Sequence, residues 1–549
     1  MTGRKNPIAR PKDWWKGAVI YQIYPRSFQD SNADGIGDLN GIAARLREVA
    51  SLGVDAIWLS PFFTSPMKDF GYDVSNYCDV DPMFGTLTDF QALVGRAHDL
   101  GLKVMIDLVL SHTSDQHPWF KDSRQNHDNP KSDWYVWADA KPDGTPPNNW
   151  LSIFGGSAWE WDARRMQYYL HNFLREQPDL NLHAPAVQDA LLDVARFWLE
   201  LGVDGFRLDT VNFYFHDRGL RDNPPNISKQ AFEVPLSNPY AWQDHVHDKS
   251  QPENLDFLKR FRTLLDSYGE IATVGEVGDG VRALTTIAAY TAGQERLTMC
   301  YAFEFLSRIF GKAHFEKTIR DFETVIADGW GCWAFSNHDV ERHVSRWAEF
   351  CPNREQLGRF CVALLMALRG SVCIYEGEEL GLPEADVPFD LLQDPYGKTF
   401  WPEFKGRDGC RTPMVWDVEE SNAGFSGANR TWLPIAATQV PHAWYKSGRE
   451  NSATLIADYR RFIALRQTHP ALRAGAIKLT GAPANVLAFE RSAASERLLC
   501  AFNFESAPAV LKVPEGAALL AGLSAKLDDT SLRLGSFSAA YITLAAGGM

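Results

Sequence analysis

The chain has 549 residues, of which 45% are hydrophobic and 23% are charged, and this composition is typical of globular proteins rather than disordered or membrane proteins. Its 55 basic and 69 acidic side chains give a formal net charge of −14, which disfavours nucleic acid and anionic membranes as partners. No apolar run reaches the roughly 20 residues of a membrane span, and no apolar signal segment follows the N-terminal basic residues. We therefore expect a cytoplasmic protein with a small neutral ligand.

Short β-branched segments alternate with longer amphipathic segments through most of the chain, a pattern that predicts βαβ units. Eight parallel strands would close into one (β/α)8 TIM barrel of the α/β class. A helix expected at 185–201 has Pro185 in its first turn and Gly202 as its stop, and it leads into the fourth strand. The expected strands lie at 18–24, 54–59, 103–110, 203–208, 271–275, 297–303, 332–335 and 371–375.

Two further regions depart from the barrel pattern. An insertion at about 112–178, after the third strand, is dense in Trp, Asp, Asn and Gly and is predicted to form a small lobe. Beyond a helix expected at 453–468, short alternating strands predict an antiparallel C-terminal β-sandwich. The barrel is expected in two parts, at residues 1–111 and 179–470. The inserted domain B is expected at 112–178 and the C-terminal β domain at 471–549.

The eight cysteines are scattered along the chain, several of them inside apolar runs such as those of Cys361 and Cys373. This distribution is typical of small buried thiols and differs from the regular spacing of a disulfide framework or a zinc site. We expect neither disulfides nor a cysteine-bound metal.

An oxygen-rich loop near the N-terminus has the spacing of a calcium-binding loop. Its side-chain oxygens occupy positions one, three, five and nine, and a backbone carbonyl could serve at position seven; the residues are Asp30, Asn32, Asp34, Asp38 and, for the carbonyl, Ile36. Position twelve is Gly41, so the bidentate Glu of an EF-hand is missing. The loop predicts a structural Ca2+ or Mg2+, and the alternative is a hydrogen-bonded turn rich in Asx residues.

Polar residues stand directly after several expected strands, among them Asp209 after the fourth, Glu276 after the fifth and Asp339 after the seventh. One such Asp would be explained equally well as the N-cap of the next helix. In a parallel barrel, however, all these positions converge on the C-terminal face, where the loops after the strands build the active site. Their convergence predicts a catalytic site.

Two carboxyl groups on successive strands suit the cleavage of a glycosidic bond, which needs a carboxylate beside the anomeric carbon and a carboxylic acid beside the leaving oxygen. Arg207, two residues before Asp209, is expected to lower the pKa of that Asp and keep it ionised for attack. Glu276 has no cation beside it in the sequence, so a raised pKa suited to proton donation is expected.

The motifs at 107–112, 205–209, 274–276, 335–339 and 376–380, in this order, resemble the signature regions of glycoside hydrolase family 13, the α-amylase family, over nearly the whole chain. Segments 18–28 and 177–181 are similar in particular to its α-glucosidase and oligo-1,6-glucosidase branch, close to bacterial α-glucosidases that transfer glucosyl units. The resemblance implies that Asp209 is the nucleophile, Glu276 the general acid/base and Asp339 a stabiliser of the distorted sugar.

The same resemblance implies a pocket for one non-reducing glucose. Thr210, which follows the nucleophile, implies a preference for α-1,4 bonds, because relatives selective for α-1,6 bonds tend to carry Val there. Ser111 stands where many α-amylases have a calcium-binding Asn, which argues against that metal site. The residues implied around the substrate are Asp69, Tyr72, His112, Phe154, Phe173, Arg207, Thr210, His338 and Arg407.

The predicted function is that of a retaining, exo-acting α-glucosidase that needs no cofactor for catalysis, takes maltose and short maltooligosaccharides, and transfers glucosyl units to hydroxyl acceptors. It is expected to be a monomer or homodimer. An oligo-1,6-glucosidase, or a transglucosylase acting on sucrose or trehalose, would carry the same carboxylates and differ only in its loops. A non-catalytic sugar-binding homologue is a further alternative, against which the intact Asp209, Glu276 and Asp339 argue.

Overall fold

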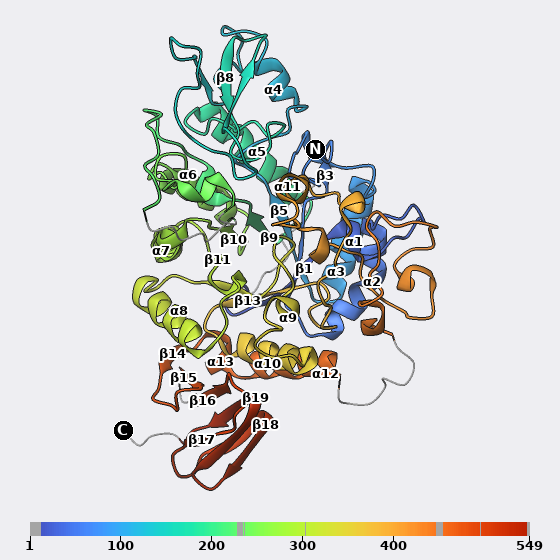
Figure 1. The fold of residues 1–549 in the computed structure, drawn as a ribbon, viewed down its shortest axis with the longest axis vertical. Coiled ribbons are helices and arrows are strands. Elements are labelled where there is room, and N and C mark those ends of the chain that lie inside the picture. Colours follow the sequence, from blue (N-terminus) through green and yellow to red (C-terminus); the bar gives the residue numbers. More distant parts are fainter. Residues whose placement is uncertain are drawn as a thin grey trace.

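The computed structural model describes residues 13–227, 234, 237–301, 303–445, 454–494 and 496–545. Its centre is an eight-stranded parallel sheet in the order β11-β10-β9-β5-β2-β1-β13-β12 (Figure 1). A parallel bridge between Cys300 of β11 and Gly331, just before β12, brings the two edge strands together. The predicted TIM barrel is thus confirmed, with strands β1 (Val19–Ile23), β2 (Ala56–Leu59), β5 (Lys103–Leu108), β9 (Gly205–Leu208), β10 (Ala272–Glu276), β11 (Met299–Tyr301), β12 (Cys332–Ala334) and β13 (Ser371–Tyr375).

Amphipathic helices surround this sheet. In α5, Pro185 occupies the first turn, where its missing N–H costs nothing, and the apolar side chains from Val187 to Trp198 are buried on one face. Gly202, in the left-handed region at φ 98°, follows the helix as predicted. The long helices are α2 (Leu39–Ser51), α3 (Leu87–Asp99), α5 (Pro185–Glu200), α6 (Asn254–Asp266), α7 (Ala283–Thr291), α8 (Lys312–Val325), α10 (Arg354–Ala367) and α12 (Leu455–Thr468).

Shorter elements lie mainly in the connections. The hairpin β3 and β4 follows β2. The remaining short helices lie in the connections of the barrel, except α13, which lies between α12 and the C-terminal strands. Their bounds are β3 (Phe63–Thr64), β4 (Asn76–Val80), α1 (Pro25–Phe28), α9 (His343–Arg346), α11 (Pro395–Phe400) and α13 (Pro470–Ala474).

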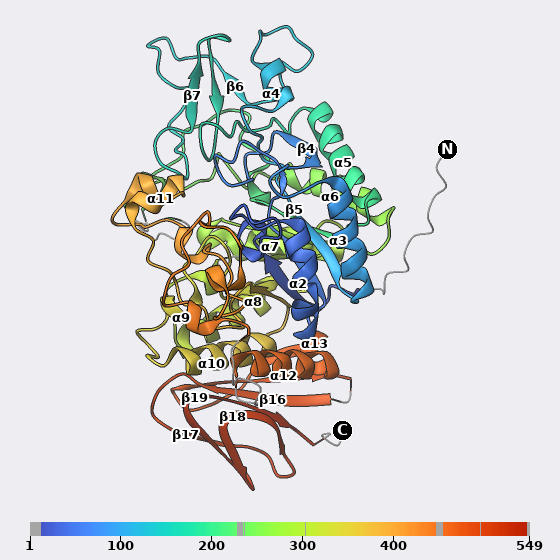
Figure 2. The ribbon, with the colours of Figure 1, turned by 90° about the vertical axis from the view of Figure 1, so that its right-hand side faces the viewer.

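The insertion between β5 and α5 forms a small lobe above the carboxyl ends of the barrel strands (Figures 1 and 2). It holds α4 (Pro118–Ser123) and a three-stranded antiparallel sheet of β6 (Trp137–Ala138), β8 (Gln167–Leu170) and β7 (Trp159–Asp162). Trp150 and Trp159 stack with ring centroids 5.9 Å apart and are buried in the core of the lobe. The lobe therefore has a small apolar core of its own, although Trp161 is 41% exposed.

The C-terminal strands form one antiparallel sheet at the opposite end of the barrel (Figure 2). Five strands follow the order β14-β15-β16-β19-β17, and β18 pairs with the other side of β19. Helices α10 and α12 lie between this sheet and the barrel (Figure 2). The strands are β14 (Ala476–Leu479), β15 (Val486–Ala493), β16 (Glu496–Asn503), β17 (Ala509–Lys512), β18 (Ala518–Asp528) and β19 (Ser531–Thr543).

Two buried arginines connect the amino-terminal end of the barrel to helices α10 and α12 and to the C-terminal sheet. Arg466 of α12 donates to the backbone carbonyls of Gly17, Met366, Leu368 and Gly370. Arg491 of β15 donates in the same way to the carbonyls of Ala367 and Gly475. Burial lowers the pKa of Arg466 to about 9. These guanidinium groups satisfy carbonyls that would otherwise be buried without partners.

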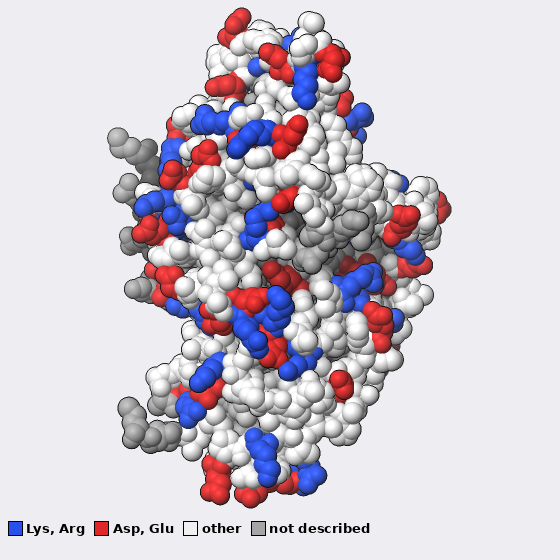
Figure 3. Space-filling model, turned by 60° about the vertical axis from the view of Figure 1, so that its left-hand side comes forward, with Lys and Arg blue, Asp and Glu red and all other residues white. Residues whose placement is uncertain are grey.

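The surface mixes charges of both signs. On the face drawn in Figure 3, acidic and basic side chains alternate over barrel, lobe and C-terminal sheet without gathering into one large patch of either sign. Among the residues described, no helix combines the length and the apolar character needed to cross a bilayer.

Candidate active site

The guanidinium group of Arg207 organises the carboxyl ends of three neighbouring strands. Its Nη1 lies 2.9 Å from an oxygen of Asp107 on β5 and 2.6 Å from an oxygen of Asp209, directly after β9. Its Nη2 lies 2.6 Å from Glu276 Oε2 at the end of β10 and donates to the Tyr301 hydroxyl at 2.9 Å. Because strands β5, β9 and β10 are adjacent, side chains far apart in sequence meet at one cation. Arg207 itself is only 1% exposed.

Thr210 links the two carboxyl groups from the other side. Its backbone N–H donates to Glu276 Oε2 at 3.0 Å, and its hydroxyl donates to Asp209 at 3.2 Å. Thr210 adopts φ 38°, a left-handed conformation that is costly for a β-branched residue. This turn directs the N–H of Thr210 at Glu276 immediately after the strand that carries Asp209. The acidic pair is therefore held by one guanidinium and one turn.

Burial governs the protonation of this pair. It raises the pKa of Asp209 to about 7 and that of Glu276 to about 7, while Arg207 opposes both shifts. Arg207 acts to lower the pKa of Asp209 as predicted, but the expected net lowering is wrong, because the cation is shared with Asp107 and Glu276 and burial outweighs it. The raised pKa of Glu276 is confirmed, but its expected reason is wrong: Arg207 does contact it, and burial is the cause. Both groups change protonation state near neutral pH.

Asp339 differs from the pair in its protonation. Burial acts to raise its pKa, whereas His338, Arg411 and Arg407 act to lower it, and the net shift is downward. Burial also lowers the pKa of His338 to about 3, so this ring is neutral at pH 7. The permanent cations beside Asp339 are therefore Arg411, at 2.7 Å, and Arg407, at 3.3 Å. Asp339 is ionised across the physiological pH range.

The opposite end of the site is a second ionic cluster around Arg407. Its Nη2 donates to Asp69 and to Asp394, each at 2.8 Å. The Tyr72 hydroxyl donates to Asp107 at 3.1 Å and contacts the Nε2 of His338 at 2.5 Å. Because these groups hold one another in place, the cluster presents fixed polar atoms to a ligand.

These residues line a cavity of about 190 Å3 at the carboxyl end of the barrel. The predicted aromatic residues Phe154 and Phe173, both from the inserted lobe, line it, and their ring centroids are 6.0 Å apart. Its other lining residues are Asp69, Tyr72, His112, Ile153, Asp209, Thr210, Phe213, Glu276, Gly278, Phe303, Leu306, Ser307, Asp339, Val340, Tyr396 and Arg407. A barrel with two carboxyl groups on β9 and β10, beneath such a cavity, has the parts that glycoside cleavage requires.

Comparison with known proteins identifies the family. The sequence pattern of the α-amylase catalytic domain matches residues 22–475. The chain belongs to the α-amylase family, glycoside hydrolase family 13.

Several members of family 13 are similar over nearly their whole lengths. A probable α-glucosidase of Rhizobium meliloti (strain 1021) is 60% identical over 92% of this chain and 91% of its own. An oligo-1,6-glucosidase of Parageobacillus thermoglucosidasius is 35% identical over 91% and 92%, respectively. The crystal structure of the α-glucosyl transfer enzyme XgtA matches with a TM-score of 0.93 and 52% identity, covering 97% of this chain and 99% of that one. The trehalulose synthase MutB of Pseudomonas mesoacidophila MX-45 matches with a TM-score of 0.87 and 32% identity, covering 97% and 100%.

The structure brings all twelve predicted catalytic and substrate-binding residues of this family 13 site together. Ten line the cavity. The other two lie beside it: Arg207 contacts both members of the acidic pair, and His338 lies 3.2 Å from Asp339. Several residues of the site were not predicted. Most of them are either aromatic or aliphatic residues that line the cavity, or charged residues of the ionic cluster at Arg407. They include Asp394, Arg411, Tyr301, Phe213, Phe303, Leu306, Val340 and Tyr396.

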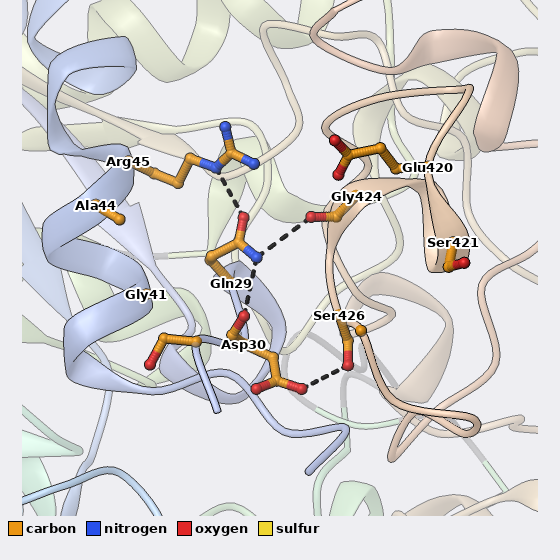
Figure 4. A pocket seen from close by; sticks show the side chains of 11 residues that line it. Gln29, Asp30, Gly41, Ala44, Arg45, Glu420, Ser421, Gly424 and Ser426 are labelled. Carbon is orange, nitrogen blue, oxygen red and sulfur yellow. Dashed lines mark hydrogen bonds between the residues drawn. The ribbon is translucent and has the colours of Figure 1, made fainter. Parts of the chain in front are cut away.

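The oxygen-rich loop lies apart from this site, beside a second cavity of about 500 Å3 (Figure 4). Asp30 accepts hydrogen bonds from the N–H groups of Asn32, Ala33 and Gly35 and from the Ser426 hydroxyl. Asp38 accepts from Ser31 and from the N–H of Gly41.

Two more hydrogen bonds of this kind join residues two apart in the sequence. The N–H of Asp34 donates to Asn32 Oδ1, and the N–H of Ile36 donates to Asp34 Oδ1. These are the bonds of an Asx-rich turn, the alternative left open by the sequence. Within the described residues, no three His, Cys, Asp or Glu side chains gather closely enough to hold a metal ion. The side chains of Asp30, Asn32, Asp34 and Asp38 therefore each accept at least one hydrogen bond from a backbone N–H group of this segment.

Proposed function

We propose that the protein is a retaining, exo-acting α-glucosidase that prefers the terminal α-1,4 bond of maltose and short maltooligosaccharides and also transfers the glucosyl unit to other hydroxyl groups. The observation that carries this proposal is the contact of both Asp209 and Glu276 with one guanidinium group. Carboxyl groups bridged in this way lie close together, in keeping with the roughly 5–5.5 Å separation of retaining enzymes rather than the wider gap of inverting ones.

In the proposed first step, the Asp209 carboxylate attacks the anomeric carbon and Glu276 gives its proton to the leaving oxygen. The bond from carbon to that oxygen breaks as the bond to Asp209 forms. In the second step, Glu276 takes a proton from water or an alcohol, whose oxygen displaces Asp209 with a second inversion. The raised pKa of Glu276 supports its role as proton donor, and Arg207 offsets the charge that develops on Asp209.

The proposal of exo action rests on the ionic cluster at Arg407, which lines the cavity. There, Arg407 is fixed between Asp69, Asp394 and Asp339, so the polar atoms that would bind the hydroxyl groups of a terminal glucose are already in position. Tyr72 and His112 complete this end, and His112 Nε2 contacts the carbonyl of Tyr72 at 3.0 Å. A longer chain would have to extend past Glu276 on the other side.

The linkage preference rests on Thr210, whose side chain lines the cavity beside Glu276. The second candidate is an oligo-1,6-glucosidase or a sucrose-acting transglucosylase. An oligo-1,6-glucosidase is 35% identical to this chain, and the trehalulose synthase MutB, of which a mutant was crystallised with the substrate sucrose, is 32% identical. Initial rates on maltose, isomaltose, sucrose and trehalose, measured side by side, separate the candidates. We expect maltose to be hydrolysed fastest. Faster turnover of isomaltose or sucrose would contradict this proposal and support the second candidate.

Azide rescue of two variants tests the two carboxyl roles. In Asp209→Gly, azide can enter the vacated space and attack the substrate directly, which gives the β-glucosyl azide. In Glu276→Ala, an activated aryl α-glucoside still forms the covalent intermediate, and azide then attacks it to give the α-glucosyl azide. The assignment would be contradicted if each variant gave the other anomer of the azide. It would also be contradicted if both variants kept full activity and azide changed neither.

Three further proposals concern the whole chain. The eight cysteines are all free, which supports a reducing cytoplasmic location. We retain the division into a barrel (1–111 and 179–470), domain B (112–178) and a C-terminal domain (471–549). We also retain a structural Ca2+ or Mg2+ at Asp30 to Asp38, for which the alternating oxygen side chains are the support.

A further inference from the structure

The two carboxyl oxygens of Glu276 have different partners. Oε2 lies 2.6 Å from Nη2 of Arg207 and accepts from the backbone N–H of Thr210 at 3.0 Å. Oε1 accepts from the hydroxyl of Tyr301 at 2.8 Å. Because a carboxyl oxygen has two lone pairs, both lone pairs of Oε2 face N–H groups, whereas Oε1 has one lone pair left.

This difference indicates which oxygen carries the proton that Glu276 transfers. Neither the guanidinium group of Arg207 nor the amide N–H of Thr210 can accept a hydrogen bond, so a proton on Oε2 would point at another donor. A proton on Oε1 meets no such conflict, since the hydroxyl of Tyr301 occupies one lone pair and leaves the other. The transferred proton is therefore expected on Oε1.

The hydroxyl of Tyr301 is itself held in place from its other side. Nη2 of Arg207 donates to it at 2.9 Å, so the hydroxyl accepts from a permanent cation and donates to Glu276. Tyr301 is 5% exposed at the end of β11 and packs in an apolar cluster with Val274 and Leu306. Turning the hydroxyl away from Glu276 would leave a buried donor without a partner, which is unfavourable.

The ionisable groups that act on the charge of Glu276 come from neighbouring strand ends of the barrel. One cation favours the carboxylate form, and three carboxyl groups favour the protonated form; they are the cation of Arg207 and the carboxyl groups of Asp107, Asp209 and Asp339. A hydrogen bond donated to a carboxylate stabilises its charged form. The hydroxyl of Tyr301 therefore acts in the same direction as Arg207, but on the other oxygen.

We infer that Tyr301 is a positioning residue of the acid/base: its hydroxyl, anchored by Arg207, orients Oε1 of Glu276 so that the remaining lone pair carries the transferred proton. This inference rests on the proposed function and specifies how its acid/base is held. In the first step, the proton moves from Oε1 to the leaving oxygen as the glycosidic bond breaks. In the second step, Oε1 takes a proton from water or an alcohol as the bond from the anomeric carbon to Asp209 breaks.

The pH profile of Tyr301→Phe tests the inference, because this variant loses the hydroxyl and keeps the ring. On the basic side, kcat/KM on maltose falls as Glu276 of the free enzyme loses its proton. Without the donor the carboxylate is less stable, so we expect this basic limb to move upward by about one pH unit. The acidic limb, which reports the ionisation of Asp209, should stay in place.

The leaving group supplies a second measurement. We expect kcat/KM of Tyr301→Phe to fall roughly tenfold on maltose but less than about threefold on 4-nitrophenyl α-glucoside, whose leaving group needs little help from an acid. Tyr541→Phe is the matched control, because Tyr541 is also buried and its hydroxyl donates to the carbonyl of Ala363 in α10. This control should lose stability but keep the pH profile and the ratio between the two substrates.

Replacement of Tyr301 by 3-fluorotyrosine tests the same bond if the phenylalanine variant does not fold. Burial raises the pKa of Tyr301 well above its usual value, so the hydroxyl of the fluorinated ring stays protonated and is a stronger donor. The basic limb is then expected to move downward, opposite to its shift in Tyr301→Phe.

The outcomes separate this inference from the proposed function. An unmoved basic limb in either folded variant, or an equal loss of Tyr301→Phe on the two substrates, would overturn the role of Tyr301 and leave the α-glucosidase proposal standing. If the natural protein cleaves neither maltose nor 4-nitrophenyl α-glucoside, the proposed function fails and the inference fails with it.

Discussion

Two buried arginines, Arg207 at the carboxyl end of the barrel and Arg466 near its amino-terminal end, show how one residue type serves two purposes. Arg207 contacts the carboxyl groups of Asp107, Asp209 and Glu276. Arg466 has backbone carbonyls as its partners instead, those of Gly17, Met366, Leu368 and Gly370. Both are at most 1% exposed.

The difference lies in what the partners can do. Carbonyl groups are fixed dipoles that cannot exchange protons, so the contacts of Arg466 contribute only to stability. The carboxyl groups around Arg207 outnumber the cation, and burial raises their pKa into the neutral range. An excess of acid over base in a buried cluster is unfavourable for folding but gives groups that can change protonation state at neutral pH. Substituting each arginine separately therefore tests the comparison.

The largest expected effect is on activity, in Arg207→Lys. Lysine keeps the positive charge but cannot bridge Asp209 and Glu276 with a planar fork. We expect kcat/KM on maltose to fall on the order of 10^2–10^3-fold, the loss typical of removing one preorganised donor. The melting temperature, measured on the same preparation, should fall less than in Arg466→Lys. Retention of activity within a factor of five would contradict the role given to Arg207.

The reverse result is expected for Arg466→Lys. A lysine can reach only some of the four carbonyls, and each buried carbonyl left unpaired costs roughly 1–3 kcal/mol. We expect the free energy of unfolding to fall by roughly 3–4 kcal/mol, measured by denaturant titration, while kcat/KM of the folded enzyme stays unchanged. A loss of activity without a loss of stability would show that the two ends of the barrel do not divide their tasks in this way.

The interior could be predicted from the sequence more completely than the site. Hydrophobic periodicity is local, so all eight strands, the helix after Pro185 and the antiparallel C-terminal sheet could be read directly from it. The carboxyl groups of Asp209 and Glu276 could also be predicted as candidate catalytic groups, because they stand at strand ends. The contact of Arg207 with Glu276, 69 residues away, was not, since nothing in either segment indicates which strands become neighbours.

The apolar lining residues of the cavity and the partners of Arg407 were missed for the same reason. Asp394 and Phe303 lie in irregular segments without a periodic pattern, and only the closed barrel places them at the cavity. The sequence did carry one signal, which is position: Phe303 and Val340 each follow a barrel strand by a few residues, as Asp339 does. Apolar residues at such positions resemble core residues in the sequence.

A buried carboxyl group shortly after β13, that of Glu378, extends the comparison to the pH dependence of stability. Burial raises the pKa of Glu378 from 4.5 to about 8. In the unfolded chain the group ionises near pH 4.5, so its contribution to stability is complete below that pH and is lost progressively up to about pH 8. Glu378→Gln removes this titration and keeps one oxygen to accept from the N–H of Tyr375, while the amide nitrogen replaces the oxygen that accepts from the Tyr459 hydroxyl.

The variant should therefore gain stability relative to the natural protein as pH rises from 4.5 to 8, by several kcal/mol with an upper limit of roughly 5 kcal/mol, since the pKa difference is about 3.5 units and each unit is worth about 1.4 kcal/mol. Melting temperatures at a series of pH values measure this gain. Glu505→Gln, at an exposed position of the C-terminal domain, is the control and should show no such trend. A constant difference between Glu378→Gln and the natural protein over this pH range would contradict this account of Glu378.

The smallest expected effect concerns the loop at Asp30 to Asp38. If it binds Ca2+ or Mg2+, removal of the ion by a chelator should lower the melting temperature by a few degrees, and readdition should restore it. In Asp34→Ala the chelator should have no further effect. An unchanged melting temperature together with no ion found by elemental analysis would leave the hydrogen-bonded turn as the whole explanation.

The most direct test of the central claim is NMR of the first product released from maltose, followed before mutarotation mixes the anomers. A double displacement through Asp209 predicts α-glucose from the non-reducing residue, accompanied by an α-glucoside when an alcohol is present. Initial β-glucose would mean a single displacement with inversion, and it would contradict both the nucleophile assigned to Asp209 and the shared-cation geometry on which the proposal is based.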